Sequence, residues 1–229
     1  MIIVPVVAKN VNQALLQIRR ANSRADGIEL RLDHFEKLGE AELERMIRAC
    51  RKPCICTCRT IGEGGEFQGS EEMGMQVLMR AIKHGAHFVD LEFTIKPALR
   101  KKLIEYAKKH RAQVILSRHF TKHTPSKKEL NALLGKMARE KAHVVKIVTH
   151  ATKHTDNAIV LELFKDARKK KVELIAFCMG EKGKDSRVLS KLLGAFASFA
   201  SLGRGLESAP GQIPLDEFRK IQHEMRSFL

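Results

Sequence analysis

The feature that most constrains the fold is a regular alternation of short apolar runs with longer amphipathic segments, which continues along all 229 residues. The runs have the length of β-strands, and the segments between them repeat apolar residues with the period of an α-helix. Strands joined by helices pair in parallel, so eight such units in a chain of this length predict a (β/α)8 TIM barrel, an α/β fold. The apolar runs occupy residues 2–7, 27–33, 53–59, 88–93, 113–119, 143–151, 173–179 and 195–201, and the helix-like segments occupy residues 10–22, 39–51, 69–85, 96–111, 125–141, 154–171, 184–194 and 214–227.

An open, doubly wound sheet would show the same alternation. The dinucleotide-binding version of that sheet carries a GxGxxG motif after its first strand, because the glycines let the backbone approach a pyrophosphate. No such motif follows residues 2–7, which favours the barrel. The chain has no low-complexity tract, linker or change in composition, so we expect residues 1–229 to form a single domain.

Polar residues recur at every second position within several of the apolar runs. Alternate side chains of a strand point to opposite faces, so Glu29 and Arg31 share one face and Ile28 and Leu30 share the other. In a barrel the apolar face packs against the helices, and the polar face points to the axis. Most of these polar residues lie near the carboxyl ends of their strands, where barrel enzymes keep their active sites. The residues expected to converge there are Glu29, Arg31, Arg59, Glu92, His119 and Lys146.

Lys146 interrupts the apolar run "HVVKIVTHA", where burial of an ammonium group without a partner would be costly. We expect desolvation and the nearby Arg31 and Arg59 to favour the neutral amine, which is a nucleophile toward ketones and forms a Schiff base. His119 is the corresponding candidate for proton transfer. The arginines are suited to binding a substrate carboxylate through two parallel hydrogen bonds.

The formal net charge of +16 raises the alternative of a nucleic-acid-binding module. Basic residues cluster in "RKKLIEYAKKHRAQ" and "FKDARKKKVE", which have helical periodicity and are typical of solvated helix faces. The chain has one tyrosine and no tryptophan, so aromatic surfaces for stacking bases are scarce. We therefore expect no nucleic-acid partner, and we expect the positive field to attract a small anionic substrate.

Five cysteines are present, and three of them occur as "CICTC". On a strand this spacing places all three on one face, whereas zinc sites space their cysteines as CxxC. We therefore expect buried, reduced thiols and no metal site. The apolar N-terminal segment is short, lacks a basic region and is followed by no long apolar run, so we expect a cytoplasmic protein without a membrane partner.

Several motifs, taken in order, resemble one enzyme family. The resemblance is to type I 3-dehydroquinate dehydratase, a Schiff-base lyase of the shikimate pathway, and it extends from about residue 2 to residue 221. His119 precedes Lys146 by 27 residues, as in that family. The other matching motifs are "ELRLD", "CRTIGEGGE", "MGEKGKDSR" and "SAPGQ".

The resemblance implies a syn dehydration of 3-dehydroquinate to 3-dehydroshikimate without a metal or cofactor. In it, Lys146 forms the imine, His119 is the general acid and base, and Glu63 supports the histidine. The glycine-rich segments "GEGGEFQG" and "SLGRGLESAPGQIPL" are expected to be mobile loops at the site, and the family implies a homodimer. The residues matching the substrate-binding set are Glu29, Arg31, Arg59, Met179, Arg187, Ser208 and Gln212.

The sequence departs from the family beside the histidine, where Arg118 and Phe120 replace a tyrosine and an acidic residue. Asp90 and Glu92 have no assigned role and are interpreted as polar filling of the barrel. A lysine-imine aldolase would share Lys146, but sugar-phosphate aldolases need a phosphate site, and no clear one is present. His34, His123, His150 and His154 are likewise left without a role.

Overall fold

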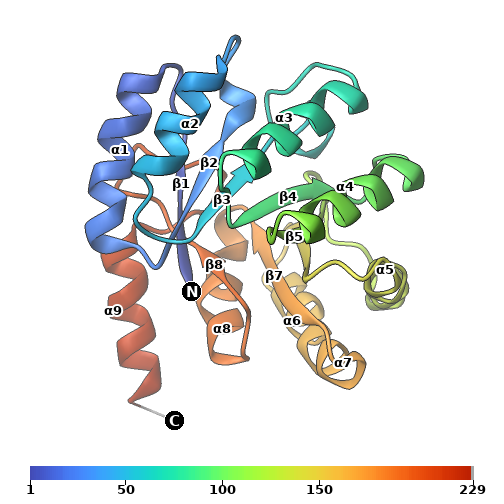
Figure 1. Cartoon of the computed structure of the whole chain (residues 1–229). Coiled ribbons are helices and arrows are strands. Elements are labelled where there is room, and N and C mark those ends of the chain that lie inside the picture. The colour runs from blue at the N-terminus through green and yellow to red at the C-terminus, as the bar shows by residue number, and fades with distance from the viewer. Residues whose placement is uncertain (228–229) are drawn as a thin grey trace.

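The computed structural model describes residues 1–227 and contains eight parallel strands that form one curved sheet. The first seven strands pair with one another in chain order, and the eighth strand pairs with the first. Figure 1 shows the strands surrounding a central axis, with helices on the outside. The strands are β1 (Ile2–Val6), β2 (Gly27–Arg31), β3 (Cys54–Thr57), β4 (Phe88–Glu92), β5 (Gln113–His119), β6 (Val144–His150), β7 (Glu173–Met179) and β8 (Ser198–Phe199).

The sheet closes into a barrel between its last two strands. The backbone N–H of Phe196, just before β8, donates to the carbonyl oxygen of Leu174 in β7 at 2.9 Å. On its other side, β8 pairs with β1 through Ser198 and Phe199. The predicted (β/α)8 barrel is therefore confirmed, although β8 is much shorter than the run 195–201 that the sequence indicated.

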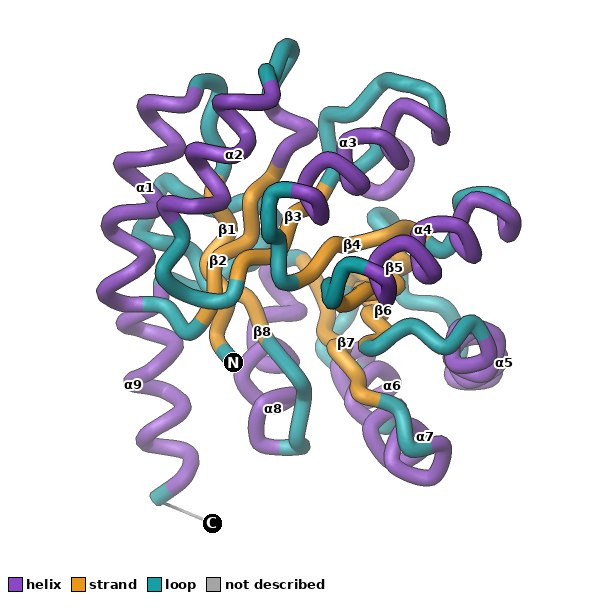
Figure 2. Tube along the Cα trace, in the orientation of Figure 1, coloured by secondary structure: helices purple, strands orange, loops and turns teal. Residues whose placement is uncertain are grey.

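Helices connect the strands and cover the outside of the barrel (Figure 2). The predicted helix 154–171 is divided at Glu162 into two helices, although Glu162 itself keeps helical backbone angles. Short 3-10 turns follow β2, β3 and β7, and the sequence did not indicate them. The helices are α1 (Val11–Arg24), α2 (Glu40–Ala49), α3 (Glu71–Lys83), α4 (Pro97–Lys109), α5 (Lys127–Arg139), α6 (Asp156–Leu161), α7 (Leu163–Lys170), α8 (Lys184–Leu192) and α9 (Leu215–Arg226), and the 3-10 turns are η1 (Leu32–His34), η2 (Ile61–Glu63) and η3 (Glu181–Gly183).

Local signals explain where several helices begin. The side chain of Ser126 accepts a hydrogen bond from the N–H of Glu129, whose carboxylate bonds back to the N–H of Ser126. This capping box satisfies two donors that a helix start leaves free, and it begins α5 where the sequence predicted. Pro97 occupies the first turn of α4, where no N–H is needed. None of the described helices has the length and apolar character needed to cross a membrane.

Buried apolar side chains form two separate layers, one between strands and helices and one inside the barrel. Cys54, Cys56 and Cys58 belong to the outer layer and carry free thiols, as the alternation of the strand predicted. At the amino ends of the strands the inner layer forms an apolar floor; its other members, such as Phe177 and Met179, lie nearer the carboxyl ends together with most of the polar inward side chains. This floor consists of Ile3, Ile55, Phe88, Ile115, Val144 and Ile175.

Candidate active site

A cavity of about 280 Å³ opens at the carboxyl ends of the strands. The residues that the family resemblance assigned to the site all line this cavity, although they come from six strands or strand-end loops and from α8. Glu92, which the strand alternation also placed at this end, does not line the cavity and instead contacts Arg59 and Thr60 beside it. The strands bring together side chains that are far apart in the sequence, as barrel active sites require. The predicted residues in its wall are Glu29, Arg31, Arg59, Glu63, His119, Lys146, Met179, Arg187, Ser208 and Gln212.

Lys146 lies in the middle of β6, with only 4% of its surface exposed. Its Nζ donates to Oδ2 of Asp90 at 2.8 Å and lies 3.7 Å from Oε1 of Glu29. The ammonium also lies 4.4 Å from the centre of the Phe199 ring, within range of a cation–π contact. The nearest charged partners of the amine are therefore carboxylates, whereas the sequence had led us to expect arginines around it.

Asp90 joins the lysine to Arg59 and is the main contact that sequence reasoning missed. Its Oδ1 accepts from Nη2 of Arg59 at 2.8 Å and from the Ser117 hydroxyl at 2.5 Å. Burial alone would raise the pKa of the Asp90 carboxyl, but the charges of Arg59 and Lys146 hold that pKa well below its usual range. Asp90 is thus an ionised link between two buried cations, which is more than polar filling of the barrel.

Arg59 is itself surrounded by carboxylates. Burial disfavours its charge, but Asp90, Glu92 and Glu63 outweigh that effect and raise the pKa of Arg59 above its usual value. Glu92 also accepts from the backbone N–H and the hydroxyl of Thr60 at 2.8 Å each. These bonds fix the loop that follows β3, which carries Glu63 into the cavity.

His119 ends β5 and is held from two directions by one carboxylate oxygen. Oε2 of Glu63 lies 3.0 Å from both the backbone N–H and the ring Nδ1 of His119. Burial, with the positive charges of Arg59 and Lys146, holds the pKa of His119 well below its usual range. The imidazole is therefore neutral at pH 7, and donation from Nδ1 to Glu63 leaves Nε2 with a free lone pair.

The other oxygen of Glu63 binds the residue at which this chain departs from the family pattern. Nη1 of Arg118 lies 2.5 Å from Oε1 of Glu63, and the Thr94 hydroxyl donates to the same oxygen at 3.3 Å. The Arg118 guanidinium also lies 4.9 Å from the centre of the Phe120 ring. The side chains of Arg118 and His119 are thus linked through the carboxylate that they share.

Glu29 and Arg31 occupy the end of β2, and each has a protein partner. The Thr57 hydroxyl donates to Oε1 of Glu29 at 2.8 Å, while Arg31 forms two hydrogen bonds with Asp33 at 2.9 and 2.7 Å. Burial acts against the charge of Arg31, but Asp33 raises its pKa. Asp33 also accepts from the N–H of Glu66 at 3.1 Å, which attaches the glycine-rich loop to β2.

Arg187, in α8, is the exception to this pairing. Only 1% of it is exposed, and no carboxylate among residues 1–227 forms an ion pair with it. Its guanidinium lies 4.5 Å from the Phe177 ring, donates to the Pro210 carbonyl at 3.3 Å and leaves Nε without a partner. Burial lowers the pKa of Arg187 to about 10. A buried guanidinium of this kind favours an anionic ligand.

The loop between β8 and α9 completes the wall beside Arg187. The N–H and hydroxyl of Ser208 bond to Oε1 of Gln212 at 2.8 and 3.4 Å. The N–H of Gly180 donates to Pro210, and a side chain on Gly211 would collide with the Gly180 backbone. Met179 lies at the end of β7 beside this loop. Loop and strand are therefore in close backbone contact next to the cavity.

Fold and site together define a class of protein. It is a (β/α)8-barrel enzyme with a buried strand lysine, a neutral histidine and an unpaired arginine in a cavity at the carboxyl ends of the strands. The described residues contain no group of His, Cys, Asp and Glu side chains arranged to hold a metal ion.

Comparison with known proteins gives the family. The model of the type I 3-dehydroquinase family matches residues 2–228, and the chain belongs to that family. The 3-dehydroquinate dehydratase of Thermococcus gammatolerans is 37% identical over 94% of each chain. That of Methanocaldococcus jannaschii is 32% identical over 96% of this chain and 97% of its own.

A solved structure agrees with this assignment. The 3-dehydroquinate dehydratase of Enterococcus faecalis superposes with a TM-score of 0.86 at 27% identity, covering 97% of this chain and 92% of its own. The protein is accordingly a lyase of the type I 3-dehydroquinate dehydratase kind, an enzyme type of the shikimate pathway.

Proposed function

We propose that the protein dehydrates 3-dehydroquinate to 3-dehydroshikimate through an imine on Lys146, with His119 as the general acid and base. The observation that carries this proposal is the joint placement of three groups in one cavity. They are the buried amine of Lys146, the neutral imidazole of His119 and the unpaired guanidinium of Arg187. A nucleophile, a proton carrier and an anion-binding group are what the reaction needs.

The first step forms a bond between Nζ of Lys146 and the C3 carbonyl carbon of the substrate. The amine must lose a proton before it attacks, and the carboxylates of Asp90 and Glu29 lie 2.8 and 3.7 Å from it. Loss of the carbonyl oxygen as water leaves a protonated imine. The positive nitrogen then accepts electron density from C2, so this chain needs no metal or cofactor for the chemistry.

The second step transfers one proton twice, first from C2 to His119 and then from His119 to the leaving hydroxyl. Its free Nε2 takes a proton from C2, and the electrons of that bond move toward the imine nitrogen to give an enamine. The imidazolium then returns the proton to the departing C1 hydroxyl, which leaves as water on the same face. A low pKa suits the first transfer, since the ring must be neutral when the substrate binds. Glu63 holds Nδ1 and stabilises the transient charge.

Substrate binding divides between two groups of residues. Arg187, Ser208 and Gln212 hold the carboxylate, while Glu29, Arg31 and Arg59 hold the hydroxyl groups and Met179 lines the pocket. The loop of residues 203–212 closes over the bound molecule and excludes water until product release. Hydrolysis of the product imine then frees 3-dehydroshikimate and restores Lys146. A homodimer, a cytoplasmic location and a single domain over residues 1–229 remain predictions.

Borohydride trapping tests this proposal directly. Reduction during turnover of 3-dehydroquinate should attach the substrate carbon skeleton to Lys146, and mass spectrometry of a digest should find the adduct on that residue alone. The exposed Lys122 is a control for surface reactivity. An adduct on another lysine, or formation of the product enone by Lys146→Met at the normal rate, would overturn the mechanism.

A further inference from the structure

Three of the turns that lead from a helix into the next strand share an unusual backbone conformation. Arg111, Lys141 and Lys171 have φ angles of +60°, +58° and +54°, and they are the described non-glycine residues with positive φ. They follow α4, α5 and α7 at intervals of 30 residues. A side chain is disfavoured in this left-handed region, so the position after a helix usually carries glycine.

Two other turns of the same barrel use glycine at the equivalent position. Gly85 after α3 and Gly194 after α8 have φ angles of +93° and +92°. In the turns that follow α3, α4, α7 and α8, the residue after the positive-φ position donates its N–H to the carbonyl oxygen of the residue five positions earlier. These four turns are therefore of one kind, the turn after α5 shares their positive φ, and the fold does not require a cation at this position.

The three cations belong to a larger surface, which we call the basic rim and define as residues 108–111, 139–141 and 168–171. These segments hold nine lysines and arginines and one carboxylate, Glu140, which is bound by Arg100 at 2.6 Å. All nine cationic residues are exposed. Lys169 approaches Asp166 only at 3.9 Å, so the rim holds a large excess of positive charge.

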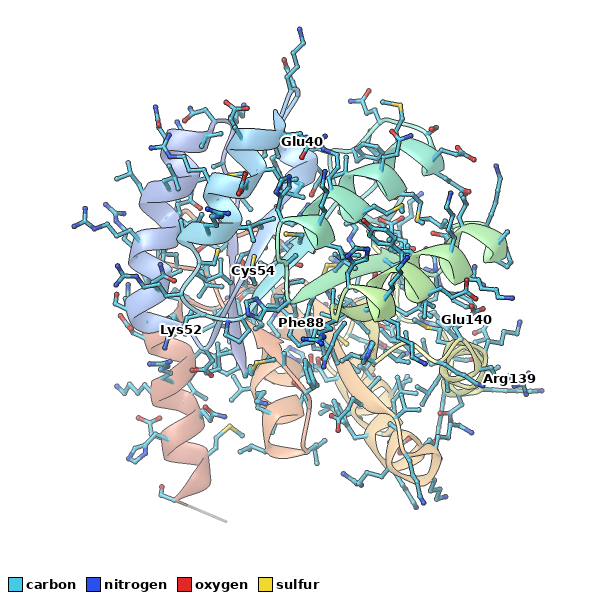
Figure 3. The ribbon with its side chains drawn as sticks, viewed as in Figure 1. Glu40, Lys52, Cys54, Phe88, Arg139 and Glu140 are labelled. Carbon is cyan, nitrogen blue, oxygen red and sulfur yellow. The ribbon has the colours of Figure 1, made fainter. Side chains whose placement is uncertain are left out.

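The basic rim lies at the amino end of the barrel, because each of its turns leads into the start of a strand. Figure 2 shows α4, α5 and α7 following one another around one side of the barrel. Figure 3 labels Arg139 at the end of α5, where its side chain extends away from the molecule. The cavity opens at the opposite end, so substrate binding does not account for this charge.

Favourable interaction with helix dipoles explains part of this charge, since cations stabilise the last turn of a helix. It does not explain the three strained positions, because Lys108, Lys109, Lys169 and Lys170 already supply cations to the last turns of α4 and α7. At Arg111, Lys141 and Lys171, glycine would relieve strain while leaving those cations in place. The cations at these positions are therefore best explained by a ligand outside the protein.

We propose that the basic rim binds the phosphate backbone of double-stranded nucleic acid without reading its sequence. Cations on separate turns can each neutralise a phosphate, and such contacts position a protein on a duplex without selecting bases. A duplex requires no stacking surface, and the single tyrosine already packs on His110 with ring centres 4.3 Å apart. The earlier expectation of no nucleic-acid partner rested on the helical periodicity of the basic clusters and on the scarcity of aromatic residues, and this mode of binding uses exposed cations without aromatic residues.

The rim is less suited to a membrane or an acidic protein. Both partners gain affinity from apolar or aromatic side chains that insert or anchor. The exposed large apolar residues of the described chain include none within the rim segments; they are Leu16, Ile61, Met73, Leu193 and Leu206. Phosphate contact by charge alone is the mode of binding that remains for this surface.

The test compares two triple variants that lose the same charge. Arg111→Gly, Lys141→Gly and Lys171→Gly remove rim cations at positions where glycine fits the backbone. Lys9→Gln, Lys37→Gln and Lys122→Gln remove exposed cations at the other end of the barrel, outside the cavity wall. Binding to a fluorescein-labelled duplex DNA is followed by anisotropy between about 50 and 200 mM salt.

We expect the unmodified protein to bind with a logarithmic salt slope of about −0.9 for each phosphate neutralised. The rim variant should reduce that slope by about 2 to 3 and weaken binding roughly tenfold or more, while the control variant stays near the unmodified protein. Dehydratase activity of the rim variant should be unchanged. Equal losses in both variants, no binding by the unmodified protein, or binding only to phosphatidylglycerol vesicles or polyglutamate would overturn the proposal.

Discussion

The two ends of the barrel carry charge in opposite ways. At the carboxyl end, Lys146, Arg59 and Arg31 are buried, and each has a carboxylate within 2.8 Å. At the amino end, the cations of the basic rim are exposed and largely without acidic partners. Burial makes an unpaired charge expensive, whereas water removes most of that cost at the surface. Cations buried in the barrel are therefore paired with carboxylates. The absence of such a partner at Arg187 indicates that this guanidinium binds the negative charge of a ligand.

Replacement of a lysine by methionine at each end of the barrel should give the largest difference in activity between the two ends. Lys146→Met removes the nucleophile while keeping a similar volume, and Asp90 retains Arg59 as a partner, so the fold should persist. We expect kcat to fall roughly 10⁴-fold or more, as for removal of other catalytic nucleophiles. Lys141→Met, in the basic rim, should leave kcat unchanged. Steady-state assays with circular dichroism of both variants check this, and comparable losses would remove the distinction between the two ends.

Arg187 tests whether an unpaired buried cation is reserved for substrate. Arg187→Met should raise KM about 10- to 100-fold, because a charge-assisted contact with a carboxylate is worth about 1.5–3 kcal/mol. The free energy of unfolding should not fall by a similar amount, since residues 1–227 give this guanidinium no carboxylate partner. Kinetics and urea unfolding measured on the same preparation distinguish the two effects. A large loss of stability with an unchanged KM would assign Arg187 to the fold.

Arg118 tests how charge pairing at the carboxyl end sets the protonation of His119. Arg118→Gln removes a cation from Oε1 of Glu63, so the carboxylate should stabilise the imidazolium more strongly. The pKa of His119 should therefore rise. Since the neutral ring is the base, the acid limb of the kcat/KM profile should move to higher pH.

Arg118→Lys keeps the charge and should restore most of the original pH profile. Substitution of His110 in the basic rim should leave the profile in place, because that ring is exposed at the other end of the barrel. An acid limb that stays where it is in Arg118→Gln would mean that Arg118 does not act on His119 through Glu63.

The smallest expected effect concerns the backbone of the amino end. Gly85→Lys places a side chain at φ +93° with no other atom within 4 Å, so backbone strain is the main cost. We expect it to lower the free energy of unfolding by about 1 kcal/mol. Arg111→Gly reverses this exchange in an equivalent turn and should change stability by less than about 0.5 kcal/mol, because strain relief offsets the entropy of glycine. Urea denaturation measures both, and equal costs would deny that Arg111 is strained.

The strand alternation was enough to predict the barrel and the inward face of each polar residue. It works because successive side chains of a strand must point to opposite faces, and because a barrel leaves one face to the helices. Lys146 and His119 could therefore be assigned to one cavity from their positions alone. The length of β8 was wrong, since apolar residues 195–201 pack well without forming a full strand.

Partners across strands were harder to predict than faces. Asp90 and Ser117 reach each other, and Asp90 reaches Lys146, only because the register sets Glu92 opposite Ser117 and Ser117 opposite Lys146. Alternation with a period of two residues predicts which face of the strand a side chain lies on, but it does not predict which residue of the neighbouring strand lies beside it. The shared orientation of Asp90 and Glu92 beside a buried lysine was nevertheless a usable signal for an ion pair.

The apolar floor beneath Lys146 determines how the substrate enters and the product leaves. Ile3, Ile55 and Ile115 are at most 1% exposed and fill the axis together with Phe88. Polar molecules do not pass through this apolar floor, so the product leaves through the same opening of the cavity by which the substrate enters. Newly formed 3-dehydroshikimate and incoming 3-dehydroquinate therefore exclude one another. Accumulated product should raise the apparent KM and leave the maximal rate unchanged, so the rate of this step at a given substrate concentration depends on how quickly the next enzyme removes the product.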